Sequence, residues 1–504
     1  MTTYLYTAAQ VRELDRLAIA KQGIPGIQLM KRAGRAVLET LLECWPQPPQ
    51  LTVYCGSGNN GGDGYMVAAL AQQQRIPVTV VQLCDGQSLE GDARRAFEFA
   101  CQQSVSMKPF SADSPPTEGI VVDALLGTGY KGKLRVPYDQ AIRQINSCAL
   151  PVVAVDVPSG LDSDTGQAAN DCVVADLTVS FIGLKCGLYT AQGPSHSGEV
   201  FFDDLGVTGT IYREVPAAAR QLELESLLAA LPPRPRHAHK GDFGHVVVIG
   251  GESGLGGAVM MAAESAARCG AGLVSVATRR EHIAPLLARR PEIMAHAVDN
   301  PHQLLPLLQR ATVLVIGPGL GRSPWSEMVL YHASQSASQR HLPLVMDADA
   351  LNLLAEGVVV RQLPSALLLT PHPGEAARLL GTDVANIQAD RFAAVSQLQK
   401  RYKATVILKG VGSLVASDGP DADPQPGLCA QGNPGMASGG MGDVLSGVTG
   451  ALLAQGLTLQ QAAELAVCLH GTAADILAAA EGERGLLATD LVAVMRRLLN
   501  PVDD

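Results

Sequence analysis

The chain has 504 residues, too many for one ordinary hydrophobic core, and this length predicts about two to four domains. Hydrophobic residues make up 47% and aromatic residues 4%, with 52 glycines, which favours Ala/Val/Leu/Gly-rich α/β layers over an all-β sandwich. The net charge of −10 argues against a general nucleic-acid groove, so we expect no nucleic-acid partner.

The first predicted elements are two helices, followed by a strand that enters a glycine-rich turn. Apolar residues recur at helical spacing in Ala8–Lys21, and a second helix is expected in Leu29–Leu42. The strand Leu51–Cys55 runs directly into Gly56–Gly64, and another helix is expected around Val67. This layout is typical of a dinucleotide-binding unit, although the spacing is not G-x-G-x-x-G. Because Asn and Asp tolerate left-handed backbone and offer oxygens, the loop is predicted to hold phosphate, ribose or a cation, with a plain turn as the alternative.

Two further strands end in the same manner. Ile120–Leu126 leads to the glycine-rich segment 127–133, and Pro151–Asp156 leads to Val157–Gly160. Because ligands of open parallel sheets bind beyond the carboxyl ends of the strands, these ends predict one shared crevice. A single Asp after a strand is more often a helix cap or a turn residue, but three polar strand ends together favour a site.

These motifs resemble the N-terminal domain of NAD(P)H-hydrate epimerases over roughly residues 8–212. The resemblance implies a Rossmann-like doubly wound sheet, a potassium ion, and Asp156 as the group that transfers a proton at the hydroxylated nicotinamide-derived ring. Potassium would be held by Asn60, Asp123 and Ser159. The hydrated dinucleotide would be lined by Asn59, Asn60, Gly61, Gly62, Asp63, Gly127, Thr128, Gly129, Tyr130, Lys131, Gly132, Lys133 and Asp156.

A domain border is expected near residue 214, within about ten residues. Phe201–Gly206 is predicted as the last strand and turn of the first half, and a short helix is predicted in Leu222–Leu231. The proline-rich segment 232–236 that follows cannot continue a helix. We therefore predict domains at residues 1–214 and 225–504.

The second half alternates strands and helices, which predicts a mainly parallel sheet covered on both faces. The predicted strands are His245–Ile249, Leu273–Ala277, Ala311–Ile316, Pro343–Asp347, Leu367–Thr370 and Ala404–Lys409. Polar or glycine-rich segments again follow them, at residues 317–321, 347–352, 371–375 and 409–413. Taken singly, Asp347 and Asp349 are explained as helix caps, His372 as a rigid turn residue and Lys409 as a solvated strand end.

The segment Asn433–Gly447 crowds glycines up to a single carboxylate, Asp443, just before an apolar helical run. Such a junction places free N–H groups at a helix N-terminus, where they and the helix dipole can hold a phosphate. Asp443 would then lie beside the anion and accept a proton from a hydroxyl group. The alternative is a glycine turn in which Asp443 is only an N-cap.

The motifs V-M-D-A-D-A-L-N, T-P-H-P-G-E, L-K-G-x-x-S and G-G-M-G-D resemble NAD(P)H-hydrate dehydratases, a ribokinase-like family, over roughly residues 225–498. The resemblance implies a ribokinase-like, mainly parallel α/β sandwich with Asp443 as the catalytic base. It implies that the S-hydrate contacts Ala258, Gly319, His372 and Asp443. It implies that the adenine nucleotide contacts Lys409, Gly410, Val411, Gly412, Ser413 and Gly442.

The whole chain thus resembles the bifunctional NAD(P)H-hydrate repair enzymes, which epimerise the R and S hydrates of NADH and NADPH and dehydrate the S form. Bacterial-type members use ADP, giving AMP and phosphate, and eukaryotic ones use ATP; the sequence offers no physical basis for that choice. Mg²⁺ bridging the phosphate oxygens is expected. Two alternatives remain: a small-molecule kinase for a vitamin precursor, and an N-terminal half that binds without chemistry.

The remaining expectations concern the cell and the assembly. The N-terminus has no basic and apolar signal regions, and no apolar run reaches the length of a membrane span, so we expect a cytoplasmic protein with no membrane partner. The 10 cysteines include no C-x-x-C pair, so neither a zinc site nor a disulfide framework is indicated. A homo-oligomer is expected.

Overall fold

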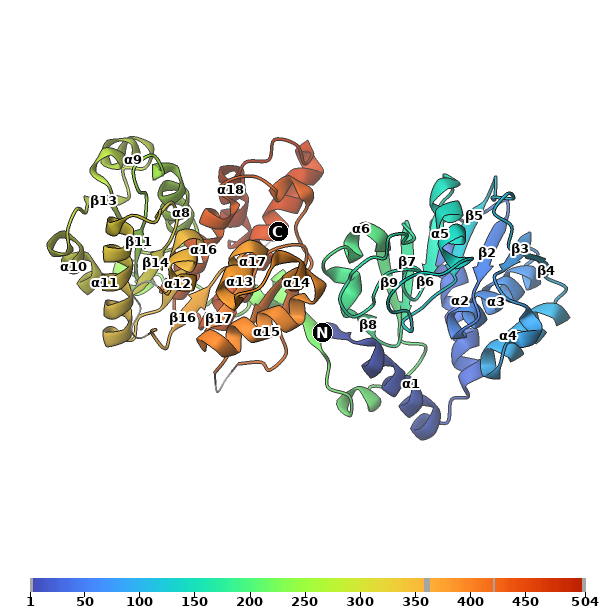
Figure 1. The fold of residues 1–504 in the computed structure, drawn as a ribbon. Coiled ribbons are helices and arrows are strands. Elements are labelled where there is room, and N and C mark those ends of the chain that lie inside the picture. The colour runs from blue at the N-terminus through green and yellow to red at the C-terminus, as the bar shows by residue number, and fades with distance from the viewer. Residues whose placement is uncertain (1–2, 358–362, 420–421, 501–504) are drawn as a thin grey trace. The chain divides into compact units, whose positions relative to one another are not determined.

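The computed structural model describes residues 3–357, 363–419 and 422–500. The chain divides into two compact units: an N-terminal unit, Tyr4–Ala219, and a C-terminal unit that begins at Arg220 and also includes Thr3. In each unit helices flank a central sheet (Figure 1). The α/β class predicted from the composition and from strand–helix alternation is therefore confirmed.

The N-terminal unit is built on a seven-stranded sheet whose strands are all parallel. In spatial order these strands are β4 (Ser106–Pro109), β3 (Val78–Gln82), β2 (Leu51–Cys55), β5 (Ile120–Ala124), β6 (Val152–Val155), β7 (Leu177–Phe181) and β9 (Glu199–Asp203). A short parallel pair joins β1 (Thr3–Tyr6) to β8 (Leu184–Lys185). The chain runs from β2 toward β4 on one side and from β5 toward β9 on the other. The strand order therefore reverses between β2 and β5, the place where doubly wound sheets bind ligands.

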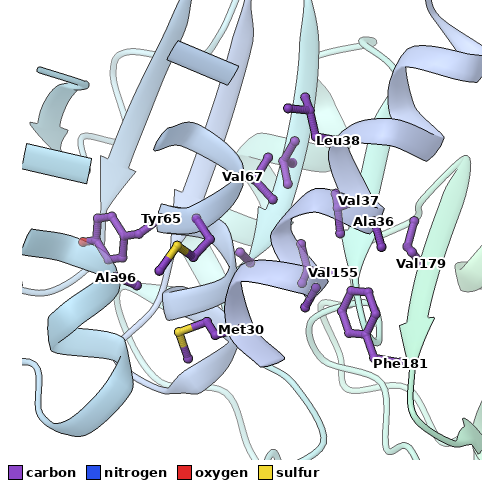
Figure 2. Close-up of a cluster of buried hydrophobic side chains, with 14 of the residues drawn as sticks. Met30, Ala36, Val37, Leu38, Tyr65, Val67, Ala96, Val155, Val179 and Phe181 are labelled. Carbon is purple, nitrogen blue, oxygen red and sulfur yellow. The ribbon is translucent and has the colours of Figure 1, made fainter. Parts of the chain in front are cut away.

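The helices of the N-terminal unit cover this sheet with apolar faces. They are α1 (Ala8–Gln22), α2 (Gly26–Cys44), α3 (Asn59–Gln73), α4 (Gly91–Gln102), α5 (Tyr138–Ser147) and α6 (Gly193–Ser197). Figure 2 shows side chains of α2 and α3 gathered with Val155 of β6 and Phe181 of β7 in the main core of the unit. At the start of α1, Thr7 and Gln10 form a capping box, and Gly23 ends the helix in left-handed backbone.

The C-terminal unit has a longer sheet in which one strand, β18 (Ser413–Ala416), is antiparallel to the others. In spatial order its strands are β13 (Met294–Ala297), β12 (Leu273–Thr278), β11 (His245–Ile249), β14 (Val313–Ile316), β15 (Leu344–Met346), β16 (Leu367–Leu369), β17 (Thr405–Leu408), β18 (Ser413–Ala416), β19 (Gly427–Cys429) and β10 (Ala219–Gln221). The antiparallel pairs are β17–β18 and β18–β19. The mainly parallel sheet is confirmed, although β10, β13, β18 and β19 were not predicted. Here the order reverses between β11 and β14.

The helices of the C-terminal unit lie on both faces of its sheet (Figure 1). They are α7 (Leu224–Leu228), α8 (Gly256–Arg268), α9 (Ile283–Arg289), α10 (Pro301–Arg310), α11 (Pro324–Arg340), α12 (Ala348–Ala355), α13 (Pro373–Leu380), α14 (Val384–Ala389), α15 (Arg391–Tyr402), α16 (Met441–Ala454), α17 (Leu459–Glu481) and α18 (Ala488–Leu498). In the described part of the chain, α17 alone has the length and apolarity of a membrane span, and 67% of its apolar window is buried inside the protein. Such burial is typical of a core helix.

Two predicted segments differ from the structure. The expected loop Gly56–Gly64 is a loop only as far as Gly58, because α3 begins at Asn59 and includes both asparagines in its first turn. Gly61 and Gly62 permit this early start, since a Cβ on Gly61 would lie 2.1 Å from the Gly56 carbonyl oxygen. The helix predicted in Leu222–Leu231 is shorter, Leu224–Leu228, since β10 extends to Gln221 before it.

Candidate active sites

The N-terminal unit holds a cavity of about 690 Å³ beside the point where its strand order reverses. The segments after β2 and β5 line it together with side chains of α1 and α2. Gly56 lets these segments meet, because a Cβ there would lie 1.9 Å from the Leu125 carbonyl oxygen. The structure thus places a cavity where the shared crevice was expected.

Asp156 lines this cavity and is fixed by a buried lysine that the sequence analysis missed. It has left-handed backbone (φ = 66°), which costs energy for any residue with a Cβ. Its Oδ1 accepts a hydrogen bond from Lys185 Nζ and another, 3.2 Å long, from the Phe181 N–H. Lys185 Nζ also donates to Ser180 Oγ at 3.2 Å and to the Phe181 carbonyl at 2.9 Å. All three donors of the ammonium group are therefore used: one bonds to the carboxylate, and the other two fix the lysine to Ser180 and Phe181.

Two more carboxyl groups, Asp15 and Asp63, line the same cavity. Burial raises the pKa of Asp15 to about 6, with Lys185 opposing the rise and Asp156 adding to it. Burial also raises the pKa of Asp63 well above its ordinary value, and the charges of Asp156 and Asp15 raise it further. The cavity therefore combines a lysine-paired carboxylate with two carboxyl groups whose pKa values are raised by burial, a difference in environment of the kind that acid–base catalysis uses.

An oxygen-rich cluster lies just behind the strand ends. Asp123 is fully buried and accepts hydrogen bonds from the Ser159 N–H at 2.8 Å and the Ser159 hydroxyl at 2.6 Å. Burial raises the pKa of Asp123 to about 6, although these bonds oppose the rise. Ser159 Oγ in turn accepts from the Leu126 N–H at 2.8 Å, and a Cβ on Gly127 would lie 3.3 Å from Asn60 Oδ1. The three residues predicted to bind potassium are therefore brought together.

Asn60 is the unsatisfied member of this cluster. It is 8% exposed, and neither its amide oxygen nor its amide nitrogen has a hydrogen-bond partner within the described residues. A buried amide without partners is costly, and a cation would satisfy its oxygen. The described residues contain no group of three or more His, Cys, Asp or Glu arranged to hold a metal. The cluster therefore fits a hard cation held by amide, hydroxyl and carboxylate oxygens.

Basic side chains occupy the more exposed part of the cavity lining. They are Arg12, Lys131, Lys133 and Arg135, all of them exposed. Lys131 pairs with Asp164 at 3.1 Å, whereas no ion pair of the other three is found in the part of the chain that the structure describes. The cavity is thus acidic in its buried part and basic at its exposed part, an arrangement suited to a ligand whose phosphates lie outward.

Most of the predicted epimerase residues line this cavity. Those that do are Asn59, Asn60, Asp63, Gly127, Thr128, Gly129, Tyr130, Lys131, Lys133 and Asp156. Gly61, Gly62 and Gly132 are not among its lining residues as described. Arg12 and Asp15 of α1 line it but were not predicted, because an amphipathic N-terminal helix gives no sign of which sheet end it will cover. Lys185 could have been found from the sequence, because it is a lysine inside the otherwise apolar run 181–188.

In the C-terminal unit, Asp347 joins three strand ends to α16. It is 1% exposed, and its Oδ1 accepts hydrogen bonds from Lys409 Nζ and Thr370 Oγ1, each at 2.7 Å. Its Oδ2 accepts from Ser446 Oγ at 2.6 Å. Burial favours a raised pKa, but Lys409 and the two hydroxyls hold the pKa of Asp347 below its ordinary value. Asp347 occupies the N-cap position of α12, yet its side chain forms no capping bond, so it is not a simple helix cap.

Asp443 lies in the first turn of α16, next to this cluster. Burial raises the pKa of Asp443 from 3.8 to about 7, the charges of Asp347 and Glu375 add to the rise, and Lys409 opposes it. The contact with the cluster is close, because a Cβ on Gly442 would lie 3.1 Å from Lys409 Nζ and 3.5 Å from Asp347 Oδ2. A carboxyl group with this pKa can accept a proton near neutral pH.

The backbone around Asp443 leaves hydrogen-bond donors free. The first N–H of α16 that bonds to the chain is that of Val444, which donates to the Gly440 carbonyl at 3.0 Å. The N–H groups of Met441, Gly442 and Asp443 donate no hydrogen bond within the described residues. Gly440 precedes them in left-handed backbone (φ = 93°), which turns the glycine-rich segment into the helix. Free donors at a helix N-terminus can bind an anion, so this geometry is compatible with the anion site predicted from the sequence.

The remaining predicted residues lie around the same strand ends. His372 caps α13: its Nδ1 accepts from the Gly374 N–H at 2.9 Å, while burial and the Lys409 charge lower its pKa. Beyond the switch between β11 and β14, Gly319 approaches Ala258 of α8, since a Cβ on this glycine would lie 3.1 Å from the Ala258 Cβ. The segment 409–413 follows β17, with Ser413 already in β18.

Comparisons with known proteins agree across both units. The family model described as NAD(P)H-hydrate dehydratase matches residues 246–497, and the model for the N-terminus of YjeF-related proteins matches residues 26–187. The bifunctional NAD(P)H-hydrate repair enzyme Nnr of Coxiella burnetii is 48% identical over 499 residues, covering 99% of this chain and 100% of that protein. The chain belongs to the bifunctional NAD(P)H-hydrate repair enzyme family.

Other relatives support this assignment. The enzyme of the same name from Escherichia coli K12 is 43% identical over 497 residues, covering 99% of this chain and 94% of that protein. A ribokinase-like superfamily protein from Enterococcus faecalis matches with a TM-score of 0.51 and 30% identity, covering 55% of this chain and 94% of that one. The predicted family and ribokinase-like fold are confirmed. The enzyme combines an N-terminal epimerase domain with a C-terminal ADP-dependent dehydratase domain for hydrated NAD(P)H.

Proposed function

We propose that Asp443 is the catalytic base of the dehydratase reaction. It accepts the proton of the ring hydroxyl of the S-hydrate, and the oxygen attacks the terminal phosphoryl group of ADP. The bond from that phosphorus to the bridging oxygen breaks, so AMP leaves. The phosphorylated hydroxyl then departs as phosphate, driven by the lone pair of the ring nitrogen. Loss of a proton from the neighbouring ring carbon completes the elimination and restores the reduced nicotinamide. Hydroxide is a poor leaving group, and conversion to phosphate provides the activation.

The free N–H groups at the start of α16 support this proposal most directly. Segment Gly439–Gly442 would hold the transferring phosphoryl group while negative charge develops on it, the type of electrostatic stabilisation that phosphoryl transfer requires. Lys409 and the segment to Ser413, with Gly442, would bind the nucleotide. Ala258, Gly319 and His372 would contact the hydrate. Mg²⁺, expected to accompany the nucleotide, would neutralise part of the charge of the phosphates.

In the N-terminal unit we propose Asp156 as the proton-transfer group of the epimerase. The proposed substrate contacts are the residues predicted from the sequence, Asn59–Asp63 and Gly127–Lys133. A potassium ion held by Asn60, Asp123 and Ser159 would supply a fixed positive charge behind these segments, and the unsatisfied Asn60 amide supports its presence. The nicotinamide-derived ring would lie toward the buried acidic groups and the phosphates toward Arg12, Lys133 and Arg135.

Three further parts of the assignment stay proposals. The domain limits are residues 1–214 for the epimerase and 225–504 for the dehydratase. The substrates are the hydrates of both NADH and NADPH, with no selection between them derived from the site. A homo-oligomer and a cytoplasmic location remain predictions from the sequence.

The experiment that tests the dehydratase proposal is the variant Asp443→Asn. Because it removes the base but keeps the size of the side chain, turnover of S-hydrate with ADP is expected to fall by about 10²–10⁴-fold. Binding of the hydrate, measured by equilibrium titration, is expected to be retained. The assay follows dihydropyridine absorbance together with AMP and phosphate. Turnover within a few fold of the wild type would contradict the role of Asp443, and a phosphorylated product without free phosphate would instead identify a kinase.

A further inference from the structure

A single buried arginine lies behind the proposed nucleotide segment 409–413. Arg391, the first residue of α15, is 1% exposed. Its Nη2 donates to three backbone carbonyls: those of Leu408 and Lys409 at 3.3 Å each, and that of Gly412 at 3.2 Å. These carbonyls come from both sides of the turn between β17 and β18, so one guanidinium group draws the two arms of the turn together.

Burial makes Arg391 a costly residue at this place. Moving a guanidinium group out of water is unfavourable unless its donors are satisfied, and burial lowers the pKa of Arg391 to about 10. It nevertheless stays charged at neutral pH, and charged hydrogen bonds to carbonyls are stronger than neutral ones. Its Nη1 is satisfied by Gln388 Oε1 at 3.0 Å. The buried charge of Arg391 is therefore satisfied mainly by carbonyls of this one turn, and these hydrogen bonds fix the conformation of the turn.

The geometry of the peptide bond links this shape to the nucleotide. In a trans peptide, the carbonyl of one residue and the N–H of the next point in opposite directions. When the Lys409 carbonyl turns toward Arg391, the Gly410 N–H therefore turns away from it. That N–H donates no hydrogen bond within the described part of the chain. Gly410 is also the residue that this packing requires, because its φ is 136° and a Cβ would lie 2.8 Å from Arg391 Nη1.

We propose that Arg391 is a positioning residue for nucleotide binding: its carbonyl contacts hold the turn 409–413 so that the Gly410 N–H and the Lys409 side chain face the phosphates of ADP. This inference rests on the proposed role of 409–413 as the nucleotide segment. Arg391 itself does not touch the nucleotide. Its positive charge behind the turn also favours the approach of an anion.

The test compares two variants of Arg391 in the full-length chain. Arg391→Met removes every donor and keeps an unbranched apolar side chain, whereas Arg391→Lys keeps a charge that reaches fewer carbonyls. Arg391→Met is expected to raise the KM for ADP by about ten-fold or more, equivalent to about 1.4 kcal/mol, with a smaller change in kcat at saturating ADP. Arg391→Lys is expected to recover part of the loss. Thermal unfolding with and without ADP provides a second measure of binding.

Two control variants separate positioning from general loss of stability. Asp390→Ala removes the N-cap of α15, whose Oδ1 accepts from the Ala393 N–H at 2.8 Å, and so weakens the same helix without touching the turn. Arg340→Met removes an arginine that donates to the carbonyls of Leu308 and Ala311, but at the end of α11. Both are expected to lower the unfolding temperature and to leave the KM for ADP within about two-fold, well under the ten-fold effect of a positioning residue.

The outcomes distinguish this inference from the proposed function. If Arg391→Met changes the KM for ADP no more than Asp390→Ala does, while the wild type still depends on ADP, Arg391 has no positioning role. If the wild type shows no dependence on adenine nucleotide, the proposed function itself fails, and the inference fails with it. A rise in KM that Arg391→Lys partly reverses, without a parallel change in the two controls, supports the positioning role.

Discussion

At the scale of single residues, the proposed chemistry of Asp443 depends on its neighbours. An exposed aspartate is almost entirely ionised at neutral pH and a weak base, whereas burial and the charges of Asp347 and Glu375 raise the pKa of Asp443 to about 7. The positive charge of Lys409 opposes this rise in pKa, but Asp347 partly neutralises the lysine through their 2.7 Å ion pair. The cluster therefore raises the pKa of the carboxyl group to about 7, near the pH at which the proposed proton transfer would occur.

The pH dependence of the dehydratase tests this environment. Because Asp443 accepts a proton only when ionised, kcat/KM for the S-hydrate is expected to fall as the pH drops through about 7. The stability of the folded protein changes with pH in the opposite direction to the rate. Because the pKa of Asp443 is higher in the folded protein than its ordinary value of 3.8, the stabilisation from protonated Asp443 is fully present below pH 3.8 and is lost as the pH rises through about 7. The unfolding temperature of Asp443→Asn is therefore expected to exceed that of the wild type more at pH 8 than at pH 5. A pH-independent difference, or a flat rate profile, would refute the raised pKa.

Lys185 provides the corresponding test in the N-terminal unit. Lys185→Met leaves the Asp156 carboxylate without its buried counter-charge, so epimerisation is expected to fall by about 10²-fold or more. Stability is expected to fall by about 3–5 kcal/mol, as when one partner of a buried pair is removed. The double variant Lys185→Met/Asp156→Asn removes both charges and is expected to regain stability but not epimerisation. Epimer exchange, followed by chromatography of the two hydrates, would show an unchanged rate in Lys185→Met if the lysine had no such role.

The residues that the sequence could reveal are those whose own type and position carry a signal. Asp156, Lys409 and Asp443 each follow a strand or a glycine turn, Asp123 lies near the end of β5, and strand ends of parallel sheets gather at one edge. Lys185 was not found, because its role comes from the partner that tertiary packing brings to it. The sequence also does not show how deeply each side chain is buried. Because burial is the main cause of the raised pKa values of Asp63 and Asp443, these could not be predicted from the sequence.

At the scale of elements, strongly apolar strands were predictable and polar helix starts were not. Strands β2, β11 and β14 are fully buried and mostly apolar, and their positions follow from that pattern. The first turn of α3 reads N-N-G-G-D, which local preferences assign to a loop. The helix forms there because the glycines pack against Gly56 and Met30. Strands β18 (S-L-V-A) and β19 (G-L-C) contain no apolar run as long as those of the predicted strands, and the sequence between them is rich in Asp and Pro, which favours a loop.

The start of α16 allows a prediction about one backbone position. Gly440→Ala places a Cβ on left-handed backbone and 2.6 Å from the side chain of Met261, so it is expected to cost about 1–3 kcal/mol and to displace the free N–H groups of the turn. Dehydration is therefore expected to fall along with the unfolding temperature. Gly439→Ala is the matched control for stability, because a Cβ there meets no atom within 4 Å. Equal unfolding temperatures for the two variants would show that the left-handed turn is not needed.

At the scale of the whole molecule, each unit contains the residues proposed for one reaction. The epimerase residues all lie within Tyr4–Ala219, and the dehydratase residues all lie after Arg220. Spontaneous hydration gives both epimers, and a dehydratase that takes only the S form would leave the R form unused. A chain that carries both activities supplies the epimerase and the dehydratase in equal amounts. Neither proposed reaction requires a side chain of the other unit.

Complementation between two variants, each lacking one of the two activities, tests this division of labour. Asp156→Ala is expected to dehydrate the S-hydrate at the normal rate and to use the R-hydrate no faster than it epimerises spontaneously. Asp443→Asn is expected to epimerise but not to dehydrate. Because each reaction needs only one unit, an equimolar mixture should convert a mixed-epimer hydrate completely to NAD(P)H, as the wild type does, when followed by dihydropyridine absorbance with ADP. A mixture that stops when the S-hydrate is consumed would show that the R-hydrate must be epimerised by the same molecule that dehydrates it.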